Sequence, residues 1–315
     1  MSDARIHVIH ENDAWVVPLR TALEARGAPY VEWFLDQGVL DLAVAPPEGV
    51  FYNRMSASSH SRGHRYAPEY TAAVLAWLES HGRRVVNGSR ALTLELSKVA
   101  QYRALAGHGI ATPRTLAAVG REAVIEAGRR LPPPFITKHN RAGKGLGVRL
   151  FHHPDGLAAH VGSAAFEPSV DGITLVQEYI AAPFITRMEF VGGRFLYAVR
   201  VDTGAGFELC PADVCRVDDA PPPFTVVEGF DHPLIGPVER FLAANGIEIA
   251  GVEFLIDAHG RAFVYDVNTN TNYNAEAEAA TGIPGRGMAA IAGFLCHELG
   301  RATGGRVGCG DRVAA

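Results

Sequence analysis

The sequence has few cysteines, no long apolar run and no large excess of charge of either sign. Four cysteines among 315 residues (Cys210, Cys215, Cys296 and Cys309) are too few for a disulfide framework, and the spacing of Cys210 and Cys215 fits no common zinc site, so we expect these two to be thiols. No apolar run approaches the ~20 residues needed to cross a bilayer. The start of the chain also lacks the apolar segment and cleavage site of a secretory signal. We therefore expect a cytoplasmic protein.

The charge balance excludes some classes of partner. There are 29 basic and 34 acidic residues, and this net charge of −5 gives no overall attraction to nucleic acid or to an anionic membrane. The apolar fraction of 48% excludes disorder over most of the chain. We expect small-molecule partners, and the sequence leaves open whether the protein forms a homo-oligomer.

The first 90 residues alternate between predicted strands and helices. Strands are predicted at residues 5–10, 30–34, 50–53 and 85–87, with helices at 11–27 and around 70–78. This order predicts a parallel sheet covered by helices. The region has no G-x-G-x-x-G motif, so a dinucleotide site there is not expected.

The rest of the chain changes to strands and hairpins after two short helices. Helices are predicted at 89–96, 97–106, 121–130, 234–245 and 287–299, and strands at 135–139, 148–151, 175–179, 187–191, 195–201, 249–256 and 262–267. Residues 204–230 are rich in Pro, Asp and Gly and are predicted to form a long surface loop. The fold class is α/β combined with α+β.

A glycine-rich segment follows the predicted strand that ends at Lys138. Gly143, Gly145 and Gly147 alternate with other residues, and glycines let backbone N–H groups approach phosphate oxygens closely. Lys138, Lys144 and the nearby Arg141 add positive charge. The segment is not a Walker A loop, because no Ser or Thr follows Gly143-Lys144. A glycine-rich hairpin turn is the alternative interpretation.

Carboxylates gather on the hairpin predicted at 249–267. If His259-Gly260 is a two-residue turn, Ala258 pairs with Arg261 and Glu253 lies opposite Asp266, with Asn268 on the same face. Such oxygen ligands suit Mg²⁺. A register shifted by one residue would leave these groups as surface charges.

Three further cations are candidates for an anion site. Lys98 begins a predicted helix, and Arg187 and Arg200 flank the Gly192-Gly193 turn. Counting across that hairpin pairs Arg187 with Ala198 and places Arg200 within reach of the same ligand. The alternative is that all three are solvated charges.

The order of these motifs along the chain resembles the ATP-grasp superfamily, and most closely its RimK-type carboxylate–amine ligases and glutathione-synthetase relatives. The resemblance covers about residues 85–295 and includes the segment Val176–Ile180. It implies an ATP-grasp fold with a Rossmann-like pre-ATP-grasp domain at 1–90, a central subdomain at 91–180 and a C-terminal subdomain at 181–315.

The resemblance also implies a role for each motif. Lys98 and Lys138 would contact the α- and β-phosphates of ATP, and residues 141–147 would cover them as a lid. The adenine hinge would comprise Gln177, Glu178, Tyr179 and Ile180. The ligands of two Mg²⁺ ions, with Mn²⁺ as an alternative, would be Glu253, Asp266 and Asn268. Arg200, with Lys138, would be catalytic, steadying the γ-phosphate and the acyl phosphate.

Two departures from the family pattern concern the substrates. No carboxylate lies between Ile180 and Arg187, where relatives hold the ribose, and residues 269–274 replace the usual Ser-Pro-Gly after Asn268. Asn270 would therefore border an unusual acceptor site, with Arg187 beside it.

The implied reaction joins a carboxylate to an amine, such as those of amino acids, through an acyl phosphate and releases ADP and phosphate. Arg54 follows a sheet strand, where ligands of open α/β sheets gather, and we expect it to pair with a substrate carboxylate; a solvated basic loop is the alternative. Two other activities fit the motifs, namely a phosphotransferase acting on a hydroxyl and a non-catalytic ATP-binding module.

Overall fold

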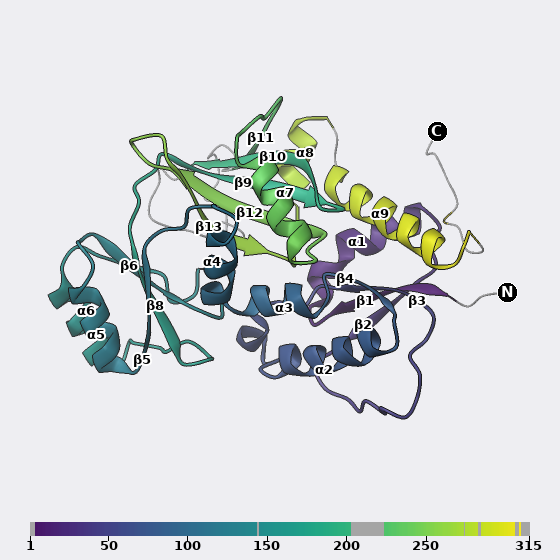
Figure 1. Ribbon diagram of the computed structural model, residues 1–315, viewed down its shortest axis with the longest axis horizontal. Helices are drawn as coiled ribbons and strands as arrows, with labels where there is room; N and C mark the ends of the chain where they lie inside the picture. The colour runs from purple at the N-terminus through teal and green to yellow at the C-terminus, as the bar shows by residue number, and fades with distance from the viewer. Residues whose placement is uncertain are drawn as a thin grey trace.

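Three β-sheets lie along the long axis of the computed structural model, each packed against its own helices (Figure 1). The structure describes residues 4–143, 145–202, 224–273, 275–282, 285–305 and 309. Among these residues, no helix is long and apolar enough to span a bilayer.

The first sheet is parallel, as the alternation of strands and helices predicts. Its strands, in the order β2-β1-β3-β4, are β1 (Arg5–His10), β2 (Tyr30–Phe34), β3 (Gly49–Asn53) and β4 (Arg84–Val86). Helix α1 (Asp13–Ala25) buries Val16, Leu19 and Leu23 against one face, and α2 (Ala67–Ser80) covers the other. The C-terminal helix α9 (Arg286–Ala302) packs beside α1 on the same face (Figure 1).

The second sheet is antiparallel and lies at the opposite end of the molecule (Figure 1). Its strands, in the order β5-β8-β6-β7, are β5 (Thr115–Val119), β6 (Phe135–His139), β7 (Arg149–Phe151) and β8 (Ile173–Glu178). Helices α5 (Arg121–Arg129) and α6 (Pro154–Gly162) bury their apolar residues against it. Helices α3 (Ser89–Leu96) and α4 (Lys98–Ala106) connect β4 of the first sheet to β5, and the short element η1 (Ser59–Arg62) lies between β3 and α2.

The third sheet has five antiparallel strands between the other two. They are β9 (Phe184–Val191), β10 (Arg194–Asp202), β11 (Phe224–Val227), β12 (Ile249–Ile256) and β13 (Ala262–Asn268), in the order β11-β10-β9-β12-β13. Helices α4 and α7 (Ile235–Ala244) cover one face of it, because their apolar residues share a core with those of β9, β12 and β13. A short helix, α8 (Ala275–Ala280), follows β13.

Most predicted elements are confirmed. The exceptions are two strands, two helices and one disulfide. Strand β11 lies inside the segment predicted as a loop, because Phe224–Val227 pairs with β10; residues 204–223 of that segment are outside the described residues. Strand β5 and helices α6 and α8 were not predicted. No disulfide framework was expected, but Cys296 and Cys309 form a disulfide that ties α9 to the segment after it.

The predicted opposition of Glu253 and Asp266 is confirmed, although the predicted turn is wrong. Ile256 pairs with Ala262, so residues 257–261 form a longer turn that displaces the register by one. A β-bulge at Tyr265 then restores it.

Candidate active site

A cavity of ≈ 290 Å³ brings together residues of the second and third sheets, of α3 and α4, and of the segments that follow β1 and β3 of the first sheet. Most of the predicted phosphate and metal residues line it: Lys98, Lys138, Gly143, Gly145, Arg187, Glu253, Asp266, Asn268 and Asn270. The structure therefore gathers in one cavity the two lysines and three oxygen ligands on which the resemblance depended: Lys98, Lys138, Glu253, Asp266 and Asn268.

A row of charged residues crosses the third sheet at the cavity. Arg187 on β9 lies directly opposite Glu253 on β12, which lies opposite Asp266 on β13. In the next row, Gly251 lies between Glu189 and Asn268. A Cβ on Gly251 would come within 2.3 Å of the Arg187 guanidinium, so this glycine leaves the space that the arginine fills.

Every carboxylate in this row has a cationic partner. Arg187 donates to Glu253 Oε1 at 2.7 Å, to Glu189 Oε1 at 2.6 Å and to Thr271 Oγ1 at 2.6 Å. Lys98 Nζ lies 2.6 Å from Asp266 Oδ1. Burial raises the pKa of Asp266, but the charges of Lys98 and Lys138 outweigh it, so that this pKa falls below its ordinary value.

This donor set fits a divalent cation with a preference for oxygen. Glu253 and Asp266 are carboxylates on adjacent strands, and the Asn268 amide lies 3.5 Å from Glu253 Oε1. Mg²⁺ is usually held by one or two carboxylates together with substrate phosphates. The cations that now neutralise these carboxylates would instead be available to phosphate oxygens.

Lys138 is buried beside the β13 bulge, and its environment disfavours its charge. Its ammonium donates to Tyr102 Oη at 3.0 Å and to the Tyr265 carbonyl at 3.3 Å, and Tyr102 also donates to that carbonyl. Burial and the positive charge of Lys98 lower the pKa of Lys138 to about 7. The bulge thus supplies a main-chain acceptor that positions the lysine of the neighbouring sheet.

The glycine-rich segment folds back over the end of β6. Gly145 and Gly147 have φ values of 69° and 74°, which non-glycine residues rarely adopt. Gly147 does not line the cavity, and Lys144 lies outside the described residues. Arg141 forms an ion pair with Glu69 of α2 at 2.6 Å, so its charge links this segment to a helix of the first sheet instead of facing the cavity.

The predicted position of Arg200 is wrong because β10 contains a bulge. Leu196 is the extra residue, and it shifts the register so that Arg187 pairs with Val199 and not with Ala198. Side chains alternate along a strand, so Arg200 lies on the opposite face from Arg187. It is exposed, and its guanidinium stacks 4.1 Å from the centre of the Phe184 ring.

The predicted adenine hinge does not border the described cavity with its side chains. The Gln177 amide donates to Tyr102 Oη and to Thr115 Oγ1, and Glu178 accepts from the Arg114 N–H. None of the four hinge residues, Gln177, Glu178, Tyr179 and Ile180, is among the described residues that line the cavity.

Arg54 is not available to a substrate carboxylate in this structure. It is 2% exposed and donates to the carbonyls of Trp15 and Thr271 and to Asn272 Oδ1. These bonds connect β3 of the first sheet to the segment after β13. Arg54 therefore supports the wall of the cavity from behind.

The cavity residues that the sequence reasoning missed include Trp15, Glu95 and Glu189. Glu189 could have been found, since it follows Arg187 by two residues on a strand and so shares its face. Glu95 lies near the end of α3, three residues before Lys98 begins α4, and it accepts from the N–H and hydroxyl of Thr269. Trp15 carries no signal that the sequence alone would separate from a core aromatic.

Comparisons with known proteins agree with this geometry. No family model matches the chain. It is 29% identical over 188 residues to a D-alanine–D-alanine ligase of Syntrophotalea carbinolica, and the match covers 58% of this chain and 58% of that protein. The similarity therefore spans little more than half of the curated relative.

Solved structures resemble the chain over nearly its whole length. A RimK-domain ATP-grasp protein from Sphaerobacter thermophilus has a TM-score of 0.65 at 21% identity, covering 92% of this chain and 99% of that one. The ATP-grasp ligase PsnB, complexed with a minimal precursor, has a TM-score of 0.68 at 18% identity, covering 94% and 99%. A PsnB structure that also contains Mg and ADP has a TM-score of 0.62 at 19% identity, covering 95% and 97%. The chain has the ATP-grasp fold, which confirms the family resemblance at the level of fold.

Proposed function

We propose that this protein is an ATP-dependent carboxylate–amine ligase that forms an amide bond through an acyl phosphate. The observation that carries the proposal is the convergence of Lys98, Lys138, Glu253, Asp266 and Asn268 on one cavity. These groups come from three separate parts of the chain. The two lysines suit the oxygens of a triphosphate, and the three oxygen ligands suit the metal ion bound to it. The Mg and ADP held by PsnB, which shares the fold, are consistent with this ligand.

Each group has a part in phosphoryl transfer. Glu253, Asp266 and Asn268 would hold Mg²⁺, as one or two ions, and Mg²⁺ bound there would neutralise phosphate charge and keep the reacting oxygens in line. Lys98 and Lys138 bind phosphate oxygens, and Lys98 exchanges Asp266 for the nucleotide. Arg187, which now pairs with Glu253, turns towards the transferred phosphoryl group, taking the part that the sequence suggested for Arg200.

The reaction has two displacements and requires no enzyme nucleophile. A substrate carboxylate oxygen attacks the γ-phosphorus of ATP, and ADP leaves. A substrate amine then attacks the acyl carbon, loses a proton and expels phosphate, leaving an amide. Because water would destroy the acyl phosphate, we assign residues 141–147 as a lid that excludes it.

The three parts of the fold divide this work. We assign residues 1–90 as the Rossmann-like pre-ATP-grasp domain, 91–180 as the central subdomain and 181–315 as the C-terminal subdomain. The cavity end lined by Trp15, Ser58, Asn270 and Asn272 would receive the acid and the amine. The side chains at this end carry no charge. The nearby Arg54 adds none, because protein groups already occupy its guanidinium.

The test is release of phosphate from MgATP in the presence of pairs of amino acids and small carboxylates, followed by mass spectrometry of any product. A ligase releases ADP only when acid and amine are both present, and hydroxylamine in place of the amine yields a hydroxamate. Transfer of phosphate to a hydroxyl would instead identify a phosphotransferase. ATP binding without turnover over the whole panel would identify a non-catalytic module, and either result would overturn the proposal.

A further inference from the structure

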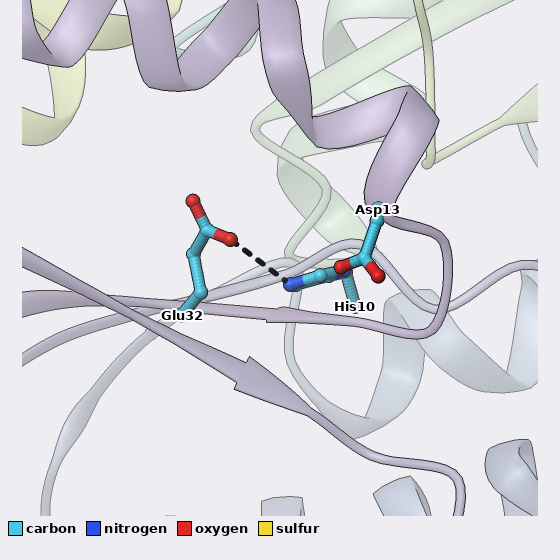
Figure 2. Close-up of side chains that lie close together, drawn as sticks. All are labelled: His10, Asp13 and Glu32. Atoms are coloured by element: carbon cyan, nitrogen blue, oxygen red, sulfur yellow. Dashed lines mark ion pairs between the residues drawn. The ribbon is translucent and has the colours of Figure 1, made fainter.

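A second group of metal-binding side chains lies at the edge of the first sheet, apart from the cavity carboxylates. His10 ends β1, Glu32 lies on the adjacent strand β2, and Asp13 begins α1. One ligand atom from each residue lies within 4.8 Å of the others. Figure 2 shows the His10 ring nitrogen lying between the two carboxylates.

The burial of His10 indicates that this group has a ligand. The residue is only 3% exposed, yet its Nε2 has no hydrogen-bond partner among the described residues. Its Nε2 lies 3.6 Å from Glu32 Oε2, beyond hydrogen-bond distance (Figure 2). Buried polar groups are normally satisfied, so an orphaned imidazole facing two carboxylates calls for a partner that accepts electron pairs from all three.

The surrounding residues would restrain these ligands in the way that a metal site requires. Arg20 donates from Nε and Nη2 to the two oxygens of Glu32, each at 2.8 Å, which fixes the orientation of that carboxylate. Ligating carboxylates are commonly held by such outer hydrogen bonds. Asp13 is exposed, so a solvent ion can reach the group without unfolding the sheet edge.

We propose that His10, Asp13 and Glu32 bind a divalent transition-metal ion, with Zn²⁺ as the best match. One imidazole and two carboxylates are ligands that Zn²⁺ accepts, leaving a fourth position for water. Mg²⁺ and Ca²⁺ favour oxygen ligands, so the imidazole selects against them. The ion would join β1, β2 and α1, and it would fix the helix turn that contains the cavity residue Trp15.

The experiment measures Zn²⁺ binding to the full chain by competition with a chromophoric chelator, with millimolar Mg²⁺ present to occupy the cavity carboxylates. Asp13→Asn is the main variant, because this exposed side chain can change without disturbing the core. Asp155→Asn is its matched control, since Asp155 is also an exposed acid in the first turn of a helix, α6. Glu253→Gln reports whether Zn²⁺ binds in the cavity instead.

We expect one tight Zn²⁺ site in the wild type. Loss of an outer hydrogen bond to a metal ligand typically lowers metal affinity ~10–100-fold, and Asp13→Asn should lower the Zn²⁺ affinity by more than this because it removes a ligand. Asp155→Asn and Glu253→Gln should leave the Zn²⁺ affinity unchanged. Zn²⁺ should also raise the unfolding temperature of the wild type but not of Asp13→Asn. Absence of a tight site, equal affinity in Asp13→Asn, or loss of the site in Glu253→Gln would each overturn the proposal, and none of these results bears on ligase activity.

Discussion

Binding of nucleotide should be accompanied by uptake of a proton at Lys138. The pKa of this lysine is about 7 in the free protein, because burial and the charge of Lys98 disfavour its ammonium form. About one tenth of the molecules therefore carry this proton at pH 8. Phosphate oxygens beside the amine favour the charged form, so its pKa rises on binding. The structure thus predicts uptake of about 0.9 proton per ADP bound at pH 8, and an affinity that falls about tenfold per pH unit above 7.

Isothermal titration calorimetry of MgADP at pH 8, in buffers of different ionisation enthalpy, measures this uptake directly. Histidines contribute little there, because their ordinary pKa of about 6.5 is well below that pH. Lys138→Arg keeps the charge but cannot lose it in this range, so it should bind without proton uptake and with a flatter pH profile. Thermal unfolding of the variant checks that it folds. Uptake of the same size in Lys138→Arg, or none in the wild type, would refute the reasoning.

Three further predictions test the cavity and the junctions around it. Glu253→Gln should lose nearly all ADP release while unfolding at close to the wild-type temperature, whereas Glu239→Gln, which alters an ion pair outside the cavity, should keep its activity. Gly251→Ala should displace the Arg187 guanidinium and lower turnover by at least about tenfold, measured with nucleotide affinity as a control for binding. Asn87→Ala should lower the free energy of unfolding by about 3 kcal/mol or more in urea titrations. The reason is that the buried Asn87 side chain bonds four main-chain groups in and next to the third sheet. An effect below about 1 kcal/mol would show that these bonds contribute little to joining the first and third sheets.

The site residues were predicted correctly where residue type and the order of the motifs along the chain were enough to identify them. Lys98, Lys138, Glu253, Asp266 and Asn268 all line the cavity, and no single motif among them was decisive. Their regular sequential order carried the prediction, because an ATP-grasp site takes its groups from several elements in a fixed succession.

The errors in strand register arise at β-bulges and at the 257–261 turn, neither of which is evident from local sequence. Leu196 turns Arg200 away from the cavity, and Tyr265 corrects a register that the turn had displaced. The carbonyl at Tyr265 is bound by Tyr102 and Lys138, which belong to other elements. The strand irregularity is thus stabilised by tertiary contacts, and counting residues along one hairpin cannot reveal them.

Helix α9 makes the core of the first sheet dependent on residues 286–302. Its residues Met288, Ile291 and Leu295 share one core with Val16 and Leu19 of α1, more than 260 residues earlier in the sequence. During synthesis, therefore, the amino-terminal layer stays incomplete until residues 286–302 have been made. A fragment that stops before residue 286 would expose the apolar residues of α1 that α9 covers, and it should aggregate. Such a fragment would still contain every group that we assign to catalysis.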